Sequence, residues 1–559
     1  MNTLIRFIII LMLNLVFIMP GILSYGQTAQ DSNKTIYKES FDVVREYMPK
    51  LTDALKLDVI PVNERIEVKK PEITYVSKAT LVKVDATKSE KIPPVVLIKT
   101  ERKPLDRFYV KAGYGNYNNI LAEAYYNSIK PKDKSLTAHA LYHSGKSGLK
   151  YSNAFQAAGD ITGRYDFRGK TLSGKVFLDN NRYQYYGFNP SDTNIWDTLK
   201  PENHRQNYLL TGFNASFANE LDKSSKFKYQ VDAGLYHFLD AQKVGELGIN
   251  IHAKLEQYFN NSPIRFEAGF HHFIINSDPT LHRNVFDIKA SYLLNLEKFK
   301  AEIGFNAPTE TDSIETKAHF YPNLKIEGQL IESYLYGFAG MTGGLMINNY
   351  RSIAYENPYI VSNFELRNSN NKMELYAGFK GNIVEKIGYK VNYSFHILEN
   401  LLLFVNDNTE QEKFQVIYDS SNTILHNIHG EMLFNILPDL SLFAGTNYFL
   451  YDQNPPEPYP WHLPIFDLTV SAKYSIQNKI LLTLDYFMIG KRYARDVLDP
   501  ATPIEMKPIH DLNLGATYKF NDKFAAFFNF NNILNSKYSY WNHYELRGFH
   551  FMAGLKGNF

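Results

Sequence analysis

The chain ends in Phe549-His550-Phe551-Met552-Ala553-Gly554-Leu555-Lys556-Gly557-Asn558-Phe559, and the side chains of this stretch alternate in polarity. Its odd-numbered positions, from Phe549 to Phe559, are mostly apolar, whereas its even-numbered positions include His550, Lys556 and Asn558. Successive side chains of a β-strand point to opposite faces. The stretch therefore predicts a strand with one apolar face and one largely polar face.

The same period of two recurs upstream, in residues 511–520, 466–474 and 227–235. A soluble sandwich of two sheets also alternates in this way, so the period alone leaves two architectures open. Segments of about ten alternating residues are the length that a tilted strand needs to cross a bilayer. This length favours a membrane barrel over a sandwich.

The connections between these segments are of two lengths that alternate along the chain. The short ones are Asn521-Asp522, Gln477-Asn478, Pro438-Asp439, Val384-Glu385, Glu297-Lys298 and Asn260-Asn261. The long ones are Arg182–Pro201, Gly343–Val361, Leu398–Ile424, Tyr451–Leu463, Tyr493–Met506 and Leu534–Arg547. Outer-membrane barrels combine tight periplasmic turns with longer outer loops. We predict an all-β, transmembrane antiparallel β-barrel of about 22 strands, an even number within 18–22.

The composition excludes several classes of protein. Lys and Arg number 60 against 58 Asp and Glu, which argues against a nucleic-acid partner because phosphate binding needs an excess of basic residues. Cysteine is absent, so disulfides and thiolate metal sites are excluded. The 40 Tyr and 39 Phe suit strands and membrane interfaces. We expect aromatic girdles that include Tyr125-Tyr126, Tyr185-Tyr186 and Tyr538–Trp541.

Residues 1–26 have the order of a secretory signal peptide. Arg6 precedes an apolar run over 7–19, and Ser24-Tyr25-Gly26 supplies small residues for cleavage after Gly26. The apolar run is shorter than the ~20 residues that a spanning helix needs, which disfavours the alternative of a signal anchor.

Residues 27–105 differ from the rest, because they are polar and interrupted by prolines. One amphipathic pattern, over 41–57, predicts a helix that Pro49 would interrupt. Residues 80–84 could form a recognition strand for an energising partner, but an ordinary extended linker is the favoured interpretation of this stretch. We divide the chain into a signal peptide at 1–26, a periplasmic arm or partial plug at 27–105, and a barrel at 106–559.

Motifs for catalysis are absent, and we assign no catalytic, cofactor-binding or metal-binding residue and no enzymatic activity. His139 and His143 would lie about 13 Å apart on one strand, too far to share a metal ion. A catalytic site at the outer rim of the barrel could be imagined from Ser144, His143 and Asp160, but nothing in the spacing of these residues supports such a site. The oxygen-rich runs at 179–181 and 406–408 lack the spacing of a calcium loop and are explained by turn chemistry.

Residues 398–424 contain two apolar strips, Leu401–Val405 and Phe414–Tyr418, and are interpreted as an extra hairpin in an outer loop. Exposed apolar strips of this kind mark a partner surface. Folding of the hairpin inward over the lumen is an equally good interpretation.

Residues 528–538, Arg547-Gly548-Phe549 and the final Phe559 resemble the end of TonB-dependent receptor barrels. Residues 110–117, 186–188 and 49–56 are similar to a Bacteroidota group of receptor-like barrels that lack the standard plug. The resemblance implies the outer membrane of a Gram-negative bacterium. A receptor plug is a longer compact domain than the 79 residues from Gln27 to Leu105.

Two functions follow from these observations. The first is an outer-membrane receptor or transport barrel without a plug. The alternative is a non-conducting structural or assembly subunit of an outer-membrane protein complex. A 22-stranded lumen is wide, so something must fill it: residues 27–105, inward-folded loops, or a partner. Expected partners are outer-membrane lipid and a periplasmic or outer-membrane protein.

Overall fold

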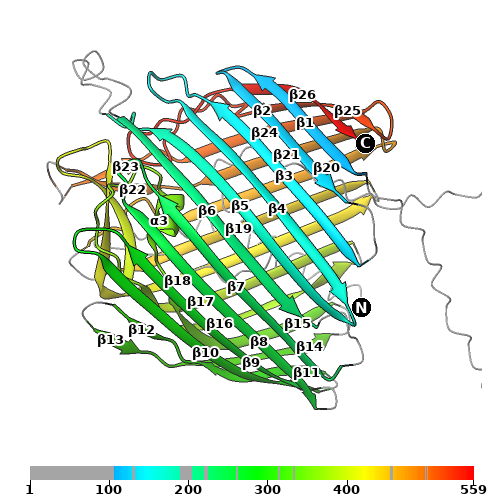
Figure 1. The fold of residues 1–559 in the computed structure, drawn as a ribbon, viewed down its shortest axis with the longest axis vertical. Coiled ribbons are helices and arrows are strands. Elements are labelled where there is room, and N and C mark those ends of the chain that lie inside the picture. Colours follow the sequence, from blue (N-terminus) through cyan, green and yellow to red (C-terminus); the bar gives the residue numbers. More distant parts are fainter. Residues whose placement is uncertain are drawn as a thin grey trace, which may run out of the picture. The chain divides into compact units, whose positions relative to one another are not determined.

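The described part of the chain is built mainly on a single sheet that closes on itself. The computed structural model describes residues 106–128, 133–188, 204–219, 225–259, 262–296, 298–312, 315–331, 334–384, 386–437, 439–453, 457–497, 499 and 502–559. Each wall strand pairs antiparallel with the next, and the last strand, β26 (His550–Asn558), pairs with the first, β1 (Phe108–Gly115) (Figure 1). The predicted antiparallel barrel is confirmed.

The wall has 22 strands, as predicted. Between β1 and β26 they are β2 (Asn119–Asn127), β3 (Lys134–Gly145), β4 (Ala154–Phe167), β5 (Lys170–Gln184), β6 (Arg205–Ala218), β7 (Phe227–Leu239), β8 (Gly245–Phe259), β9 (Ser262–Ile275), β10 (Leu281–Asn295), β11 (Phe299–Asn306), β14 (Tyr321–Ile331), β15 (Leu335–Met346), β16 (Ser369–Val384), β17 (Ile387–Asn406), β18 (Phe414–Leu437), β19 (Leu440–Asp452), β20 (Phe466–Ile476), β21 (Ile480–Ile489), β24 (Ile509–Lys519) and β25 (Phe524–Asn531). Strands β12 (Thr309–Thr311) and β13 (Thr316–Ala318) extend β11 and β14, and β22 (Arg492–Arg495) and β23 (Pro503–Met506) form a separate hairpin.

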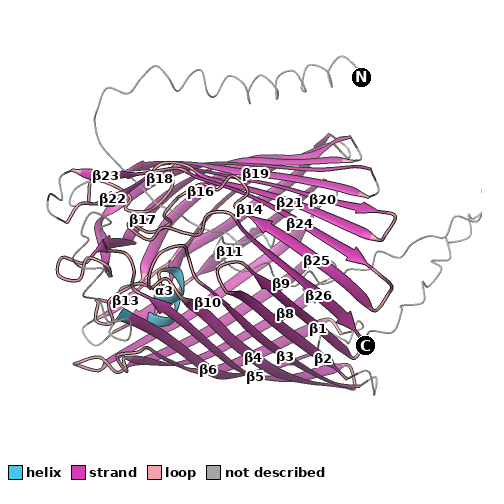
Figure 2. Ribbon diagram, turned by 90° about the horizontal axis from the view of Figure 1, so that it is seen from above, coloured by secondary structure: helices cyan, strands magenta, loops and turns pink. Residues whose placement is uncertain are grey.

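The outer surface of the wall is apolar, as the alternation predicted. Ile161 is 56% exposed and Leu555 is 63% exposed, and the large apolar side chains of neighbouring strands face the same way. A soluble protein does not expose so much contiguous apolar surface, so lipid is the solvent of this face. Figure 2 shows the strands crossing from one end of the barrel to the other.

The two ends of the barrel differ. One end carries tight turns such as Gln477-Asn478, whose φ values of 50° and 56° suit a two-residue hairpin, and also the seam where Phe108 and Phe559 exchange backbone hydrogen bonds. The other end carries the longer connections, although those at 116–118, 240–244 and 276–280 are short. By the rule for outer-membrane barrels, the turn end is periplasmic and the loop end is outside.

Residues 398–424 are a continuation of the wall. Strand β17 runs to Asn406 and β18 begins at Phe414, with one register shift between Glu399 and Leu401. The extra hairpin predicted here is present, but its two strands are direct continuations of the wall strands β17 and β18. We call residues 399–422 the outer hairpin. The predicted signal peptide at 1–26 and the arm at 27–105 lie outside the described residues.

An aromatic ring covers the seam between the first and last strands from inside. The Phe527 side chain is buried against Gly113 and Gly554, and Lys111 and Lys556 lie 5.2 and 5.3 Å from its ring centre. A Cβ on Gly554 would collide with the carbonyl oxygen of Ala112 and with the Phe527 ring. The seam therefore requires a glycine at position 554.

Replacing Gly554 with Ala is expected to lower the free energy of unfolding by about 1–3 kcal/mol, because the added methyl group forces β1 away from β26. The measurement is the temperature at which the folded band disappears in a heat-modifiability gel. Gly163→Ala is the matched control, since a Cβ there meets nothing within 4 Å. Equal melting of the two variants would contradict the role given to the seam.

Candidate functional site

The inner face of the wall is polar and charged. His139 lies 3.3 Å from Glu123 and 3.4 Å from Asp160, and Lys175 lies 3.2 Å from the same Asp160. Arg265 pairs with Glu256 at 2.6 Å further around the wall. Such a surface is compatible with water or with a polar occupant of the lumen.

A loop with a short helix enters the outer end of the lumen. We call residues 347–368, between β15 and β16, the lid. Its helix α3 (Tyr350–Glu356) begins at Asn349, whose side chain accepts a hydrogen bond from the backbone of Ser352, while the Ser352 hydroxyl accepts one from the backbone of Asn349. This reciprocal capping explains why a helix of only two turns forms here. Figures 1 and 2 place α3 at the loop end of the barrel.

Polar contacts fix both ends of the lid to the wall. Arg283, on β10, donates to the carbonyl oxygen of Asn348 at 2.6 Å and to the side chain of Asn368 at 2.8 Å. The lid joins the wall at Asn348 and Asn368. The single buried guanidinium of Arg283 therefore holds both ends of the lid. Asn368 also donates to Glu310 at 2.6 Å, which continues the network to β12.

Tyrosines attach the middle of the lid to strands elsewhere in the wall. The Tyr350 hydroxyl donates to Asp240 at 2.6 Å, and the Tyr355 hydroxyl donates to Asp179 at 2.7 Å. The hydroxyl of Tyr208, on β6, donates to the carbonyl oxygen of Pro358 at 3.1 Å. The lid thus reaches from β15 and β16 across the mouth to β5, β6 and the end of β7.

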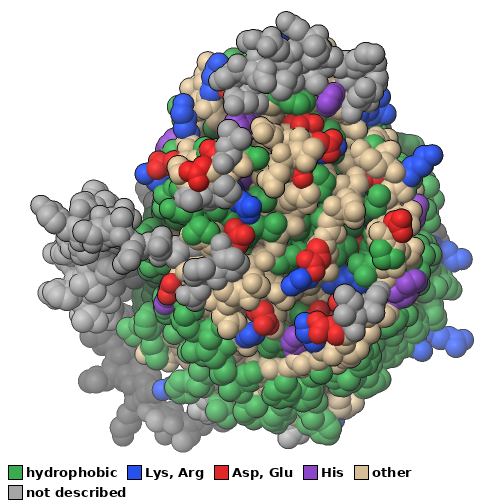
Figure 3. Space-filling model, turned by 90° about the vertical axis from the view of Figure 1, so that its left-hand side faces the viewer, with side chains coloured by type: hydrophobic (Ala, Val, Ile, Leu, Met, Phe, Trp, Pro, Cys, Tyr) green, Lys and Arg blue, Asp and Glu red, His purple; other side chains and the backbone are tan. Residues whose placement is uncertain are grey.

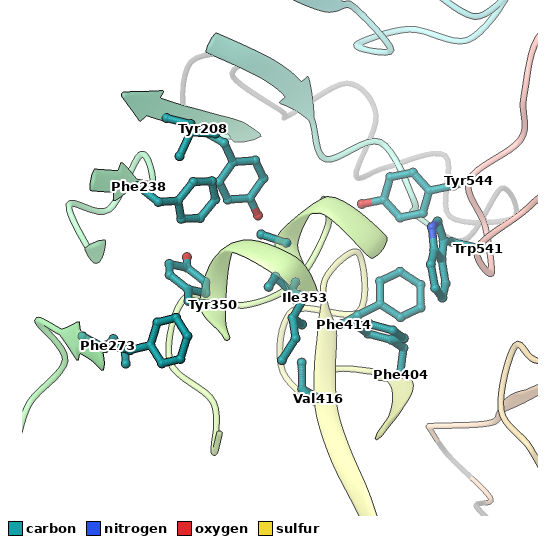
Figure 4. Close-up of a cluster of buried hydrophobic side chains, with 14 of the residues drawn as sticks. Tyr208, Phe238, Phe273, Tyr350, Ile353, Phe404, Phe414, Val416, Trp541 and Tyr544 are labelled. Atoms are coloured by element: carbon teal, nitrogen blue, oxygen red, sulfur yellow. The ribbon is translucent and has the colours of Figure 1, made fainter. Parts of the chain in front are cut away.

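A hydrophobic cluster fills the space under these contacts (Figure 4). We call it the loop cluster. It consists of Tyr186, Tyr208, Leu210, Tyr236, Phe238, Phe273, Ile275, Tyr350, Ile353, Ala354, Ile360, Phe404, Phe414, Val416, Trp541 and Tyr544. The cluster joins wall strands, the lid, the outer hairpin and the loop before β26 into one packed unit, and its burial stabilises the closed arrangement.

The outer hairpin lies against the lid. The backbone N–H of Phe414 donates to the carbonyl oxygen of Tyr359, and the N–H of Val361 donates to the carbonyl oxygen of Phe414, each at 2.9 Å. Leu403 and Phe414 are fully buried. Of the two interpretations of the apolar strips, inward packing is the one that the structure shows.

The loop between β25 and β26 completes the closure. The Tyr544 ring stacks on Tyr359 with ring centres 3.6 Å apart, and the Tyr544 hydroxyl donates to the carbonyl oxygen of Glu412. Arg492 donates to the carbonyl oxygens of Tyr540 and Ser539 at 2.6 and 2.8 Å. Figure 3 shows this end from outside, with acidic and basic side chains mixed over its surface.

A neutral histidine lies between the outer hairpin and this loop. Nδ1 of His462 donates to the carbonyl oxygen of Phe404 at 3.0 Å, and the backbone N–H of Asn542 donates to Nε2 at 3.3 Å. Burial lowers the pKa of His462 to about 3, and the nearby Arg492 acts in the same direction. Nε2 accepts this hydrogen bond only while it carries no proton. If Nε2 were protonated, its N–H would face the backbone N–H of Asn542 and the hydrogen bond would be lost.

Several aromatic residues that we assigned to interfacial girdles lie inside the protein. Tyr185, Tyr186, Tyr538 and Trp541 are buried, and Tyr186 and Trp541 belong to the loop cluster. The girdle prediction is wrong for these residues, because their strands and loops extend past the membrane level and turn inward. Tyr125 also faces the lumen, where its ring stacks 4.1 Å from that of His139.

The other residues considered from sequence are not brought together as sites. His143 hydrogen-bonds Asn119 inside the lumen at 2.7 Å, whereas the neighbouring Ser144 belongs to the opposite face of β3. Asp407 accepts hydrogen bonds from the backbone of residues 409 and 410, which is turn chemistry. Among the described ranges, no group of three or more His, Asp and Glu side chains could hold a metal ion.

Sequence comparisons find nothing: no family model matches, and no curated protein matches. Solved structures do match in fold. The FrpB iron transporter from Neisseria meningitidis has a TM-score of 0.65 and 10% identity, covering 83% of this chain and 82% of that chain. A mutant ferric enterobactin receptor PfeA from Pseudomonas aeruginosa gives 0.63 and 10%, covering 81% and 80%. The pyoverdine receptor FpvA from the same species gives 0.61 and 13%, covering 82% and 79%.

The chain therefore has the fold of the 22-strand receptor barrels of the Gram-negative outer membrane, and its apolar exterior places it in that membrane. Helical structure in the described part of the chain nowhere reaches the length and hydrophobicity of a membrane-spanning helix. At these identities the likeness concerns the fold alone.

Acidification is expected to loosen the loop cluster. The pKa of His462 in the closed state is about 3, below the ~6.5 of an exposed histidine, so the closed state loses stability as the pH falls from 6.5 towards 3. At pH 4.5 the loss is about 2–3 kcal/mol.

The fluorescence of Trp461 and Trp541 reports this opening, since Trp541 lies 5.2 Å from the His462 ring. A Trp196→Phe background removes the third tryptophan. The His462→Gln variant serves as the control. The change in tryptophan emission that protonation of His462 causes should be absent from this variant. An emission spectrum that is constant down to pH 4 would refute the linkage.

Proposed function

We propose that the chain is an outer-membrane receptor or transport barrel whose outer entrance is closed by its own loops in the resting state. The observation that carries this proposal is the anchored lid over a polar lumen. The outer ends of the wall bind the lid through Arg283, Asp240 and Asp179, while the wall below offers charged side chains. A ligand would reach those side chains only when the lid moves.

The lumen below the lid has the character of a hydrated path. Lys175 and Arg265 face inward, yet their side chains are 42% and 41% exposed. A lumen packed solid by side chains would leave such groups buried. Solvated charges of both signs suit the passage or binding of a polar solute better than a purely structural core.

We also propose that residues 27–105 occupy or cap the periplasmic mouth. The segment is shorter than the compact plug of TonB-dependent receptors, which supports a plugless barrel of the Bacteroidota type. An unfilled barrel of 22 strands would leak small solutes. A second closure at the periplasmic end is therefore expected in addition to the lid.

The alternative is a non-conducting subunit of an outer-membrane protein complex. The observation that favours it is the loop cluster, in which side chains from several loops are buried against one another. In this case the outer surface of the loops and residues 27–105 would contact partner proteins, and the lumen would never open. A stoichiometric envelope complex recovered from detergent extracts supports this second function.

Planar-bilayer conductance of the full chain separates the two functions. A variant whose residues 349–367 are replaced by a short Gly-Ser linker removes the lid, and deletion of residues 27–105 removes the proposed second closure. We expect low conductance from the full chain and a large increase when both segments are absent. Low conductance from the doubly shortened chain would contradict the proposed path, and an increase on lid removal alone would contradict the periplasmic closure.

A cross-linked variant tests the lid without removing any of its residues. The Ser362 hydroxyl lies 3.0 Å from the Gln242 side chain, and the chain has no cysteine of its own. In a chain lacking residues 27–105, joining Ser362→Cys to Gln242→Cys with a short bismaleimide is expected to abolish channel openings. Each single-cysteine variant treated with the same reagent is the control. Openings that persist after complete cross-linking would show that the lid is not the gate.

A further inference from the structure

Basic residues lie along the outer rim of one side of the barrel. Figure 1 shows β3 to β8 side by side on this side. Lys146 follows β3, Arg182 is near the end of β5, Arg205 begins β6, and Lys243 lies in the turn between β7 and β8. We call these four residues the basic row.

Alternation along the strands shows that the two arginines face the outside of the barrel and not the lumen. In β6 the buried Gln206 and Tyr208 face inward, so Arg205 and Leu209 belong to the outward set. In β5 Arg182 shares the outward face with Leu178, which is 46% exposed.

The strand register brings the members of the row together. Arg182 is opposite Asn207 and Gln184 is opposite Arg205, so the two arginines are diagonal neighbours on one face of adjacent strands. The backbone N–H of Ala241 donates to Gln206 at 3.0 Å, which holds the turn containing Lys243 beside the start of β6.

The row lies just above the apolar band. Lys146, Arg182 and Arg205 are each about twelve residues from the periplasmic end of their strands. At ~3.3 Å per residue and a tilt of ~40°, this distance is a height of about 30 Å, the thickness of the hydrocarbon core. Exposed apolar side chains, among them Tyr142, Leu178 and Phe213, lie on the membrane side of the row.

The outward positions of the described strands β3 to β9 hold no Asp or Glu. None of the ion pairs within the described ranges involves the basic row, whereas Lys372, on β16, pairs with Glu399 at 3.0 Å. The Arg182 guanidinium lies 4.5 Å from the centre of the Phe155 ring, and its buried Nε has no hydrogen-bond partner in the described part of the chain.

We propose that the basic row binds the phosphate groups of a phosphorylated glycolipid in the outer leaflet. Two guanidiniums and two ammonium groups supply forked and point-like donors for phosphate oxygens, at the height where headgroups lie. The apolar band directly below offers contact to the acyl chains. A free phosphate ion would gain nothing from that band, so the lipid is the expected ligand.

Binding to the purified full chain in a neutral detergent tests the proposal. The probes are diphosphorylated lipid A, its dephosphorylated form, and inorganic pyrophosphate as the free anion. We compare the unaltered chain with the Arg182→Gln/Arg205→Gln variant. The Lys479→Gln/Lys523→Gln variant loses the same charge at the periplasmic turns and is the matched control. Heat-modifiability gels confirm that each variant is folded.

The expected result is that the unaltered chain and the control bind diphosphorylated lipid A equally, whereas the arginine variant binds it at least about tenfold more weakly. The dephosphorylated lipid should bind weakly to all three chains. Equal binding of diphosphorylated lipid A by all three chains would overturn the proposal. Pyrophosphate binding as tight as lipid binding would also overturn it, because the site would then recognise a free anion.

Discussion

The hydrogen bonds between β1 and β26 are the interaction on which the rest of the structure depends. Inside a bilayer no water satisfies an open strand edge, so every backbone N–H and C=O must find a partner within the protein. Pairing of the first wall strand with the last removes both edges at once. Gly113 and Gly554 let the strands and the Phe527 ring approach closely at this junction.

Closure creates the second problem of the molecule, which is a wide polar lumen. At the outer end, loops fold back over the lumen, close it and bury aromatic side chains against one another. The lid alone would be too small to form a stable unit, because its helix has only two turns. Its stability comes from Arg283 at both ends and from tyrosine hydroxyls that donate to the buried carboxylate of Asp240, after β7, and to the partly buried carboxylate of Asp179, on β5.

The abundant aromatic residues serve two different environments, and this explains the error in the girdle prediction. Rings on outward positions meet lipid, as with Phe551, whereas Tyr186 and Trp541 pack inside the loop cluster. A tyrosine near the end of a strand has the same local sequence in both cases. Whether such a tyrosine meets lipid or packs inside the protein depends on whether its strand continues past the membrane. The neighbouring residues in the sequence do not reveal where the strand leaves the membrane.

The amino-acid sequence by itself determined the barrel, its even number of strands and the positions of most turns. These features are local, since alternation and turn residues act over only a few positions. Only the tertiary structure decided what happens at the outer mouth. The Tyr186 hydroxyl donates to the carbonyl oxygen of Glu545, 359 positions away, and Arg283 donates to Asn348 and Asn368, 65 and 85 positions away, at the two ends of the lid. Such contacts follow from the circular arrangement of the strands, which brings remote loops together over one opening, and no short stretch of the chain encodes them.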